Sequence, residues 1–246
     1  YNQGLVSAPV TRRVTATGTT PSAGPGHTRL VPDRPRTNTP RILNGEIWDI
    51  EVVPSLNRVF IAGNFTQLQN TTGNTAIINQ SGLASYNYET GLIDTQFRPT
   101  FNGGVNAVEA TPDGSKLFVG GSFNTVNGVT KQKVASLNLT TGAPLTTFGF
   151  TNNTNNSVQS LATTNGTLYV GGRYTRINGQ LRTGLAAVST ASGAVDMSFD
   201  NQLSGGIGVS GQLGVPQLKL THDQSKLLVV HTGRQIAGQD RYGMGI

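Results

Sequence analysis

One short pattern recurs along the chain at nearly constant intervals, and this recurrence constrains the fold more than any other feature. It occurs at residues 58–67, 116–125, 167–176 and, in degraded form, 226–235, reading RVFIAGNFTQ, KLFVGGSFNT, TLYVGGRYTR and KLLVVHTGRQ. Repeats of about this length are typical of solenoids, propellers and other arrays. The chain is therefore predicted to be a repeat protein.

Two more motifs follow each copy of this core. The first reads GLASYNYETG at 82–91, KVASLNLTTG at 133–142 and GLAAVSTASG at 184–193. The second ends in a phenylalanine, which is Phe97, Phe148 or Phe199. Length varies in two places only. The first copy has an insertion between its core and second motif, and the last has 32 residues from Phe199 to His231 where the earlier copies have 24.

Each unit reads as four short antiparallel strands. Residues 105–111 and 134–139 alternate apolar and polar, and 116–123 is rich in β-branched and aromatic residues. The segment ending at Phe148 supplies the fourth strand, and the turns at 112–115 and 140–142 contain the Asp and Gly that tight reversals favour. We expect an all-β chain, a β-propeller built of four-stranded antiparallel blades. A β-solenoid is the less favoured alternative.

The repeats define the domain organisation. Blades are expected at about 44–100, 101–150, 151–203 and 204–246, the last incomplete because Ile246 falls inside its third strand, for about three and two-thirds blades. This favours a fragment of a longer protein. The alternative is completion of the propeller by another chain or by the N-terminal segment, through self-association or strand exchange.

Residues 1–43 form a separate segment, rich in Pro, Thr and Arg, which is predicted to be an extended arm or linker. It carries six arginines and one aspartate, whereas residues 44–246 carry 12 basic and 11 acidic groups. A nucleic-acid-binding face would need basic residues clustered on the folded part. Nucleic acid is therefore a disfavoured partner, and an anionic polymer or surface contacting the arm is favoured over it.

The pattern DGSKLFVGGSFNTVNG, followed by KVASLNLTTG and a closing Phe, resembles a known propeller repeat. This is the roughly sixty-residue, delta-sixty type of repeat, found in secreted and surface proteins of bacteria, actinobacteria especially. The resemblance covers about 44–246 and implies a secreted or cell-surface module, but no single activity. The fourth copy departs from the pattern, with His231 in place of the second glycine.

Motifs for catalysis are weak. The absence of cysteine excludes disulfides and thiolate metal sites, and no serine lies in a G-x-S-x-G elbow. Residues 206–211, GIGVSG, fit a dinucleotide fingerprint only in their letters, and they are predicted to be an interblade loop. No catalytic residue is predicted, and a non-catalytic role is favoured. A propeller glycosidase or lyase with acidic residues at its axis is an alternative.

Both insertions belong to the loop face formed by the second-to-third-strand and interblade connections, which predicts a binding face there. The candidate ligand-binding residues are Asn124, Asn127, Arg173, Arg176, Asn178, Arg98, Asn153 and Asp200. The aspartates at 94 and 196 are expected to bond to nearby backbone, with calcium binding as the alternative. No cofactor other than calcium is considered. Phe65, Phe123 and Tyr174 are predicted to be interblade core.

The sequence therefore favours a secreted or cell-surface β-propeller module that binds glycan or protein through its long-loop face without catalysis. The structural alternative is a subunit of an extracellular assembly, such as a surface layer or filament, joined by strand or arm exchange.

Overall fold

The computed structural model describes residues 36–150 and 154–246. Contacts between residues divide the chain into Tyr1–Arg36 and Thr37–Ile246. The predicted arm therefore lies almost entirely outside the described residues. Its last part does not, because β1 (Arg41–Ile42) pairs with β4 (Gln67–Gln69) in the second unit.

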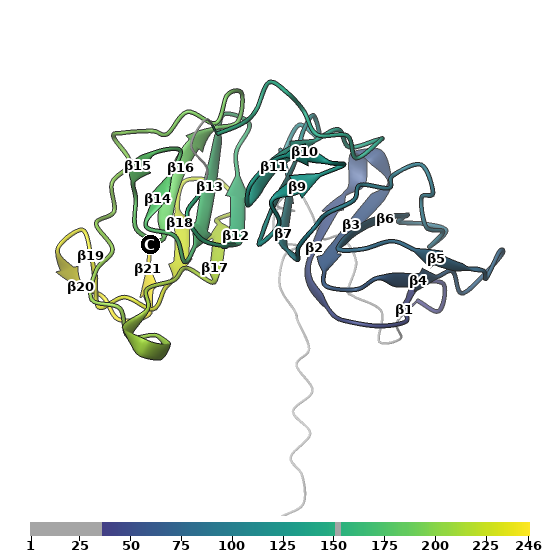
Figure 1. Ribbon diagram of the computed structural model, residues 1–246, viewed down its shortest axis with the longest axis horizontal. Helices are drawn as coiled ribbons and strands as arrows, with labels where there is room; N and C mark the ends of the chain where they lie inside the picture. Colours follow the sequence, from purple (N-terminus) through teal and green to yellow (C-terminus); the bar gives the residue numbers. More distant parts are fainter. Residues whose placement is uncertain (1–35, 151–153) are drawn as a thin grey trace, which may run out of the picture. The chain divides into compact units, whose positions relative to one another are not determined.

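The described part of the second unit is built around four main three-stranded antiparallel sheets that follow one another in chain order (Figure 1), to which smaller sheets such as that of β1 and β4 are added. In each sheet the first strand lies at an edge and the second lies in the middle. The first sheet is β2 (Ile47–Val53), β3 (Arg58–Gly63) and β6 (Leu83–Asn87), and the second is β7 (Val105–Ala110), β8 (Leu117–Gly121) and β11 (Val134–Leu137). The third is β12 (Val158–Thr163), β13 (Thr167–Gly172) and β16 (Leu185–Ser189), and the fourth is β17 (Gln217–Leu220), β18 (Leu227–Val230) and β21 (Met244–Gly245).

The expected fourth strand of each unit is reduced to a single bridge. These bridges join Tyr86 to Ile93, Leu137 to Pro144 and Val188 to Val195. The all-β fold is confirmed and the described residues contain no α-helix, but four-stranded blades are not confirmed. A polar side chain holds the closing segment instead. The Nζ of Lys131 donates to the carbonyl of Phe148 at 2.7 Å, and the Nε of Arg182, at the same repeat position, donates to that of Phe199 at 3.2 Å.

Each second-to-third-strand connection is itself a small hairpin. Two of these hairpins turn at an Asn-Gly pair, Asn127-Gly128 and Asn178-Gly179, whose four residues all have positive φ. Asn-Gly suits this turn because both residues tolerate left-handed backbone. The hairpins pair β4 with β5 (Ile77–Asn79), β9 (Thr125–Val126) with β10 (Val129–Thr130), β14 (Arg176–Ile177) with β15 (Gln180–Leu181), and β19 (Gln235–Ile236) with β20 (Gln239–Asp240). Short 3-10 turns occupy Pro54–Leu56 and Val209–Gly211.

The hydrophobic core lies mainly between neighbouring sheets. The closing phenylalanines pack edge-on against the middle strand of their own sheet, Phe97 on Phe60 and Phe148 on Phe118, with ring centroids 5.2 Å and 5.1 Å apart. Such aromatic pairs stabilise beyond the area that they bury. The three aromatic residues that follow the paired glycine positions, Phe65, Phe123 and Tyr174, are fully buried, as predicted.

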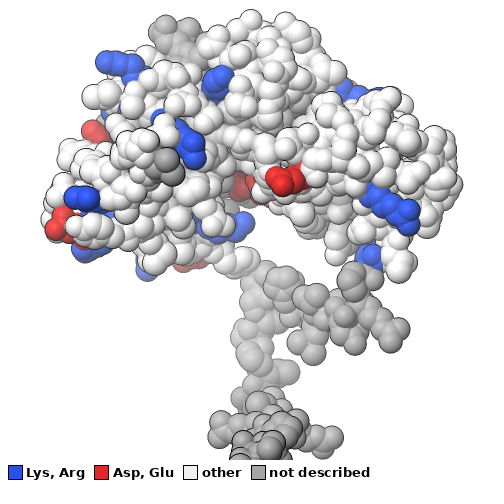
Figure 2. Space-filling view, turned by 60° about the horizontal axis from the view of Figure 1, so that its bottom comes forward, with Lys and Arg blue, Asp and Glu red and all other residues white. Residues whose placement is uncertain are grey.

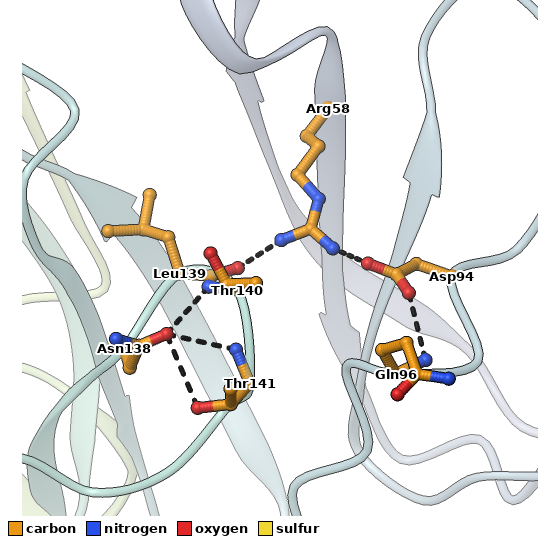
Figure 3. Close-up of polar contacts among 7 residues, drawn as sticks. All are labelled: Arg58, Asp94, Gln96, Asn138, Leu139, Thr140 and Thr141. Carbon is orange, nitrogen blue, oxygen red and sulfur yellow. Dashed lines mark hydrogen bonds and ion pairs between the residues drawn. The ribbon is translucent and has the colours of Figure 1, made fainter.

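Cationic side chains link neighbouring sheets at one end of the middle strands. Arg58, the first residue of β3, pairs with Asp94 of its own repeat and donates a hydrogen bond to the Leu139 carbonyl of the next (Figure 3). Lys116, at the same position of the second repeat, donates from Nζ to the Thr190 carbonyl of the third at 2.9 Å. Thr190 and Leu139 are equivalent, so the link is a repeated feature of the fold.

Some apolar side chains of the first and last sheets are exposed, although the side chains at the equivalent positions of the middle sheets are buried. Ile50 is 56% exposed, whereas the equivalent Val108 is 1% exposed. Met244 of the fourth sheet is 57% exposed, whereas the equivalent Leu185 is 1% exposed. The fourth sheet packs on the third through β17 and β12. In the described part of the chain, the middle sheets therefore have neighbours on both sides, and the end sheets on one.

Replacing Gly120 by alanine should destabilise the joint between the second and third sheets. A Cβ at Gly120 would lie 2.5 Å from the Cγ1 of Val158. Overpacking of this kind costs about 1–3 kcal/mol, which urea unfolding would measure. Gly166→Ala is the matched control, since a Cβ there meets nothing within 4 Å. Adding Val158→Ala to Gly120→Ala should restore part of the loss, whereas equal effects of the two glycine changes would contradict this packing.

Candidate functional site

A large cavity lies between the third and fourth sheets. It has a volume of about 770 Å³ and is lined by Gln159, Arg173, Gly208, Ser210, Gln212, Gly214, Pro216 and Thr232. A second cavity of about 310 Å³ is lined by Trp48, Asn106, Gln159 and Pro216. Because Gln159 and Pro216 line both, we treat the two cavities as one surface and name it the Trp48–Arg173 groove.

One repeat position supplies the residues of the smaller cavity. We call the first strand of each sheet (β2, β7, β12 or β17) its inner strand. The residue after the first residue of an inner strand is Trp48, Asn106 or Gln159, and Pro216 occupies the same position of the fourth repeat. In β2, β7 and β12 the register with the neighbouring strand shifts at this residue. Such bulges turn a side chain out of the regular alternation. The irregularity therefore directs one side chain per repeat into a common place.

Trp48 gives this part of the groove an apolar surface. Its side chain is 45% exposed, and its Nε1 donates to the Oε2 of Glu46 at 3.0 Å. The ring lies over the bare backbone of Gly104, where an added Cβ would be 3.1 Å from the ring atom Cζ3. The indole is thus held in place while much of the residue faces solvent.

The groove also contains polar groups. The Nδ2 of Asn106 donates to the carbonyl of Val158 at 2.7 Å, which fixes that amide. The side chains of Gln159 and Arg173 make no hydrogen bond or ion pair with the described residues. Both lie against Gly214, where an added Cβ would be 3.1 Å from the Oε1 of Gln159 and 3.3 Å from the Cγ of Arg173. An unpaired amide and an unpaired guanidinium therefore share one wall.

The long connection before the fourth sheet, which Gln159 and Arg173 contact at Gly214, builds the rest of the groove. Its Gln212–Gly214 segment is fixed by Thr232, whose Oγ1 donates to the carbonyl of Gln212 at 3.0 Å and accepts from the backbone N–H of Gly214 at 2.8 Å. The predicted interblade loop at 206–211 belongs to this connection. The extra residues of the fourth repeat thus form part of the groove.

Of the residues proposed from sequence, Arg173 is the one that lines this groove. Asn127 and Asn178 sit in hairpin turns, where their side chains bond to Thr100 and Gly193. The other candidates make local contacts in separate places. Asn124 accepts from Lys133, Arg176 donates to the Gly179 carbonyl, Arg98 to Gln80 and Asn79, and Asp200 accepts from Gln202. Asn153 lies outside the described residues.

Sequence reasoning missed Trp48, Asn106 and Gln159. Their common repeat position was visible in the aligned copies, but the alternation of each strand does not show that a bulge turns them outward. The aspartates at 94 and 196 make the expected backbone bonds, to the N–H of Gln96 at 2.8 Å and of Ser198 at 2.9 Å.

A second cluster lies along the inner strands, where three carboxylates join one sheet to the next. At the open edge of β7, the backbone N–H of Val108 donates to the Oδ2 of Asp49 at 2.9 Å. The backbone N–H of Ala110 donates to the Oε1 of Glu51 at 3.2 Å. Glu109 accepts in the same way from Thr163 of the third sheet. Satisfying an open strand edge in this way stabilises the joint and blocks other pairing.

These carboxylates line a hollow that also contains a lysine. Glu51, Glu109 and Lys219 border a cavity of about 220 Å³, and Figure 2 shows acidic side chains in the hollow at the middle of the face in view. Burial raises the pKa of Glu51 to about 7 and that of Glu109 to about 8. The neighbouring Glu51 charge adds to the rise at Glu109, and Lys219 opposes it.

Comparisons with known proteins support the repeat architecture. Residues 163–199 match the model of a family described as a beta-propeller domain of unknown function, DUF5122. The match runs from the end of β12 to the closing Phe199, so it covers most of the third repeat. No curated protein matches the chain. These findings support a β-propeller repeat family.

Among residues 36–150 and 154–246, no group of three or more His, Asp or Glu side chains is placed to hold a metal ion. No helix there has the length and apolar character needed to span a bilayer.

The free energy of unfolding of the Glu109→Gln variant should increase relative to that of the wild type as pH rises from 5 to 8. In the unfolded chain the Glu109 carboxyl ionises near its ordinary pKa of 4.5. In the folded protein its pKa is about 8, so it keeps its proton until the pH approaches that value. The wild type therefore loses about 3–4 kcal/mol of unfolding free energy between pH 5 and pH 8, and the variant avoids that loss. Urea unfolding from pH 5 to 9 measures the difference.

Glu51→Gln provides the companion measurement, because removal of the neighbouring charge lowers the pKa of Glu109. In that background the gain from Glu109→Gln should be smaller and should level off at a lower pH. A difference between variant and wild type that stays constant from pH 5 to 9 would contradict the raised pKa of Glu109.

Proposed function

We propose that this protein is a secreted or cell-surface β-propeller module that binds a glycan, without catalysis, in the Trp48–Arg173 groove. One observation carries the proposal: an exposed tryptophan shares a groove with an amide and a guanidinium that have no partner among the described residues. The indole face suits the apolar face of a sugar ring, and the polar groups suit its hydroxyls.

The shape of the site favours a glycan over a folded protein. Stable protein interfaces need about 1,200–2,000 Å² of buried surface with a central apolar anchor. The groove is instead concave, and glycines and polar side chains make up most of its lining. An extended saccharide fits such a surface, since it offers hydroxyl groups along its whole length. The extracellular location rests on the repeat resemblance.

A glycosidase or lyase is the second candidate, and one observation favours it. Glu51 and Glu109 border a cavity and have raised pKa values of about 7 and about 8, which is a common property of acid–base catalysts. We favour the binding role because Glu51 and Glu109 bond to backbone N–H groups of the next sheet, an arrangement that stabilises the fold. Release of new reducing ends from a bound polysaccharide would favour the enzyme.

Trp48→Ala should weaken glycan binding about fivefold or more. A glycan array identifies the ligand, and isothermal titration then compares the variant with the wild type. Loss of a stacked aromatic ring costs about 1 kcal/mol or more, and 1.4 kcal/mol is tenfold in affinity. Tyr242→Ala is the matched control, because Tyr242 is 66% exposed and does not line the groove. Its affinity should stay within twofold of the wild type.

Thermal unfolding should show that both variants remain folded. Unchanged affinity of Trp48→Ala, or a ligand that proves to be a protein and survives enzymatic removal of its glycans, would contradict the proposal.

A further inference from the structure

Arg173 replaces a hydrogen-bond acceptor that the other three repeats have at the same position. The equivalent residues are Asn64, Ser122 and Thr232. Each accepts a hydrogen bond from the backbone N–H of one repeat position near the start of the inner strand, at Glu46 (2.6 Å), Gly104 (3.2 Å) and Gly214 (2.8 Å) respectively. This position therefore normally holds the entry to an inner strand.

An arginine cannot accept this bond, because its guanidinium carries only donors. In the third repeat the N–H in question belongs to Ser157, and the Oδ1 of the adjacent Asn156 accepts it at 2.7 Å. A neighbouring residue has thus taken over the structural role. The residue at position 173 is therefore not needed to accept this hydrogen bond. Exceptions of this kind to a local structural pattern are expected at functional sites.

Arg173 lines the same groove as the other irregular part of the repeats, the longer connection before the fourth sheet. The connection with extra residues between Phe199 and His231 lines the groove beside Arg173. None of the residues lining either cavity of the groove is acidic. The Arg173 side chain is exposed and its guanidinium has no partner among the described residues, so it is available to a negatively charged group. Guanidinium groups bind carboxylate, sulfate and phosphate in bidentate geometry.

We propose that the Trp48–Arg173 groove selects acidic saccharides, and that Arg173 binds their carboxylate, sulfate or phosphate group while Trp48 and Gln159 contact the sugar rings. This inference rests on the proposed function of glycan binding in the same groove. Arg173 determines which glycans bind, whereas Trp48 contributes to the binding of all of them.

The test uses matched pairs of oligosaccharides that differ in charge. Tetragalacturonate is paired with its methyl ester, and a sulfated chondroitin tetramer with its desulfated form. Titration calorimetry on the full chain should give at least tenfold tighter binding for the charged member of a pair. Arg173→Gln should remove this preference and lower the dependence of affinity on salt, while the uncharged member binds as before.

Arg176→Gln is the matched control, because Arg176 lies three residues away, is exposed and is not part of the groove. It should leave both affinities within twofold of the wild type. Equal binding of charged and uncharged members would overturn the selection of acidic saccharides but leave glycan binding intact. Binding of no member of either pair would count against both proposals.

Discussion

The close approach of bare backbone in one sheet to a β-branched residue in the next is the contact on which the rest of the structure depends. A Cβ at Gly120 would lie 2.5 Å from Val158, and one at Gly171 would lie 2.8 Å from Val215. At these two joints the separation of the sheets therefore leaves no room for a side chain, and the equivalent residue of the first repeat is the small, fully buried Ala62. In the fourth repeat this position holds Val230, which is 38% exposed and has no sheet packed against it in the described residues.

Polar links can form because the sheets approach so closely. Edge N–H groups of one inner strand reach the carboxylates of the preceding strand, and Arg58 reaches the Leu139 carbonyl of the next repeat. Burial of these carboxylates raises the pKa of Glu51 and Glu109. The bulges lie where the inner strands begin, so they turn Trp48, Asn106 and Gln159 toward one surface. The site is thus a product of the same repeat that builds the core.

The sequence predicted the repeat, three strands of each unit and the buried aromatic residues, because these follow from local alternation and spacing. The hairpin at Asn127-Gly128 was also predictable, since Asn-Gly is a strong hairpin signal. Asn127 was instead a binding candidate, because its bond to Thr100, 27 residues away, cannot be read from a single sequence. Arg173, another binding candidate, lines the groove. Trp48 and Gln159 were missed because strand register, which decides where a side chain points, is set by pairing with distant residues.

Fluorescence of Trp48 during titration with a charged oligosaccharide tests glycan binding in the groove most directly. Trp48 is the only tryptophan of the chain, so any change in its emission reports on one place. We expect a saturable change in emission whose midpoint matches the affinity from calorimetry, because a sugar ring that covers the indole removes it from water. Binding detected by calorimetry with no change in the emission of Trp48 would show that the ligand binds elsewhere and would contradict the account.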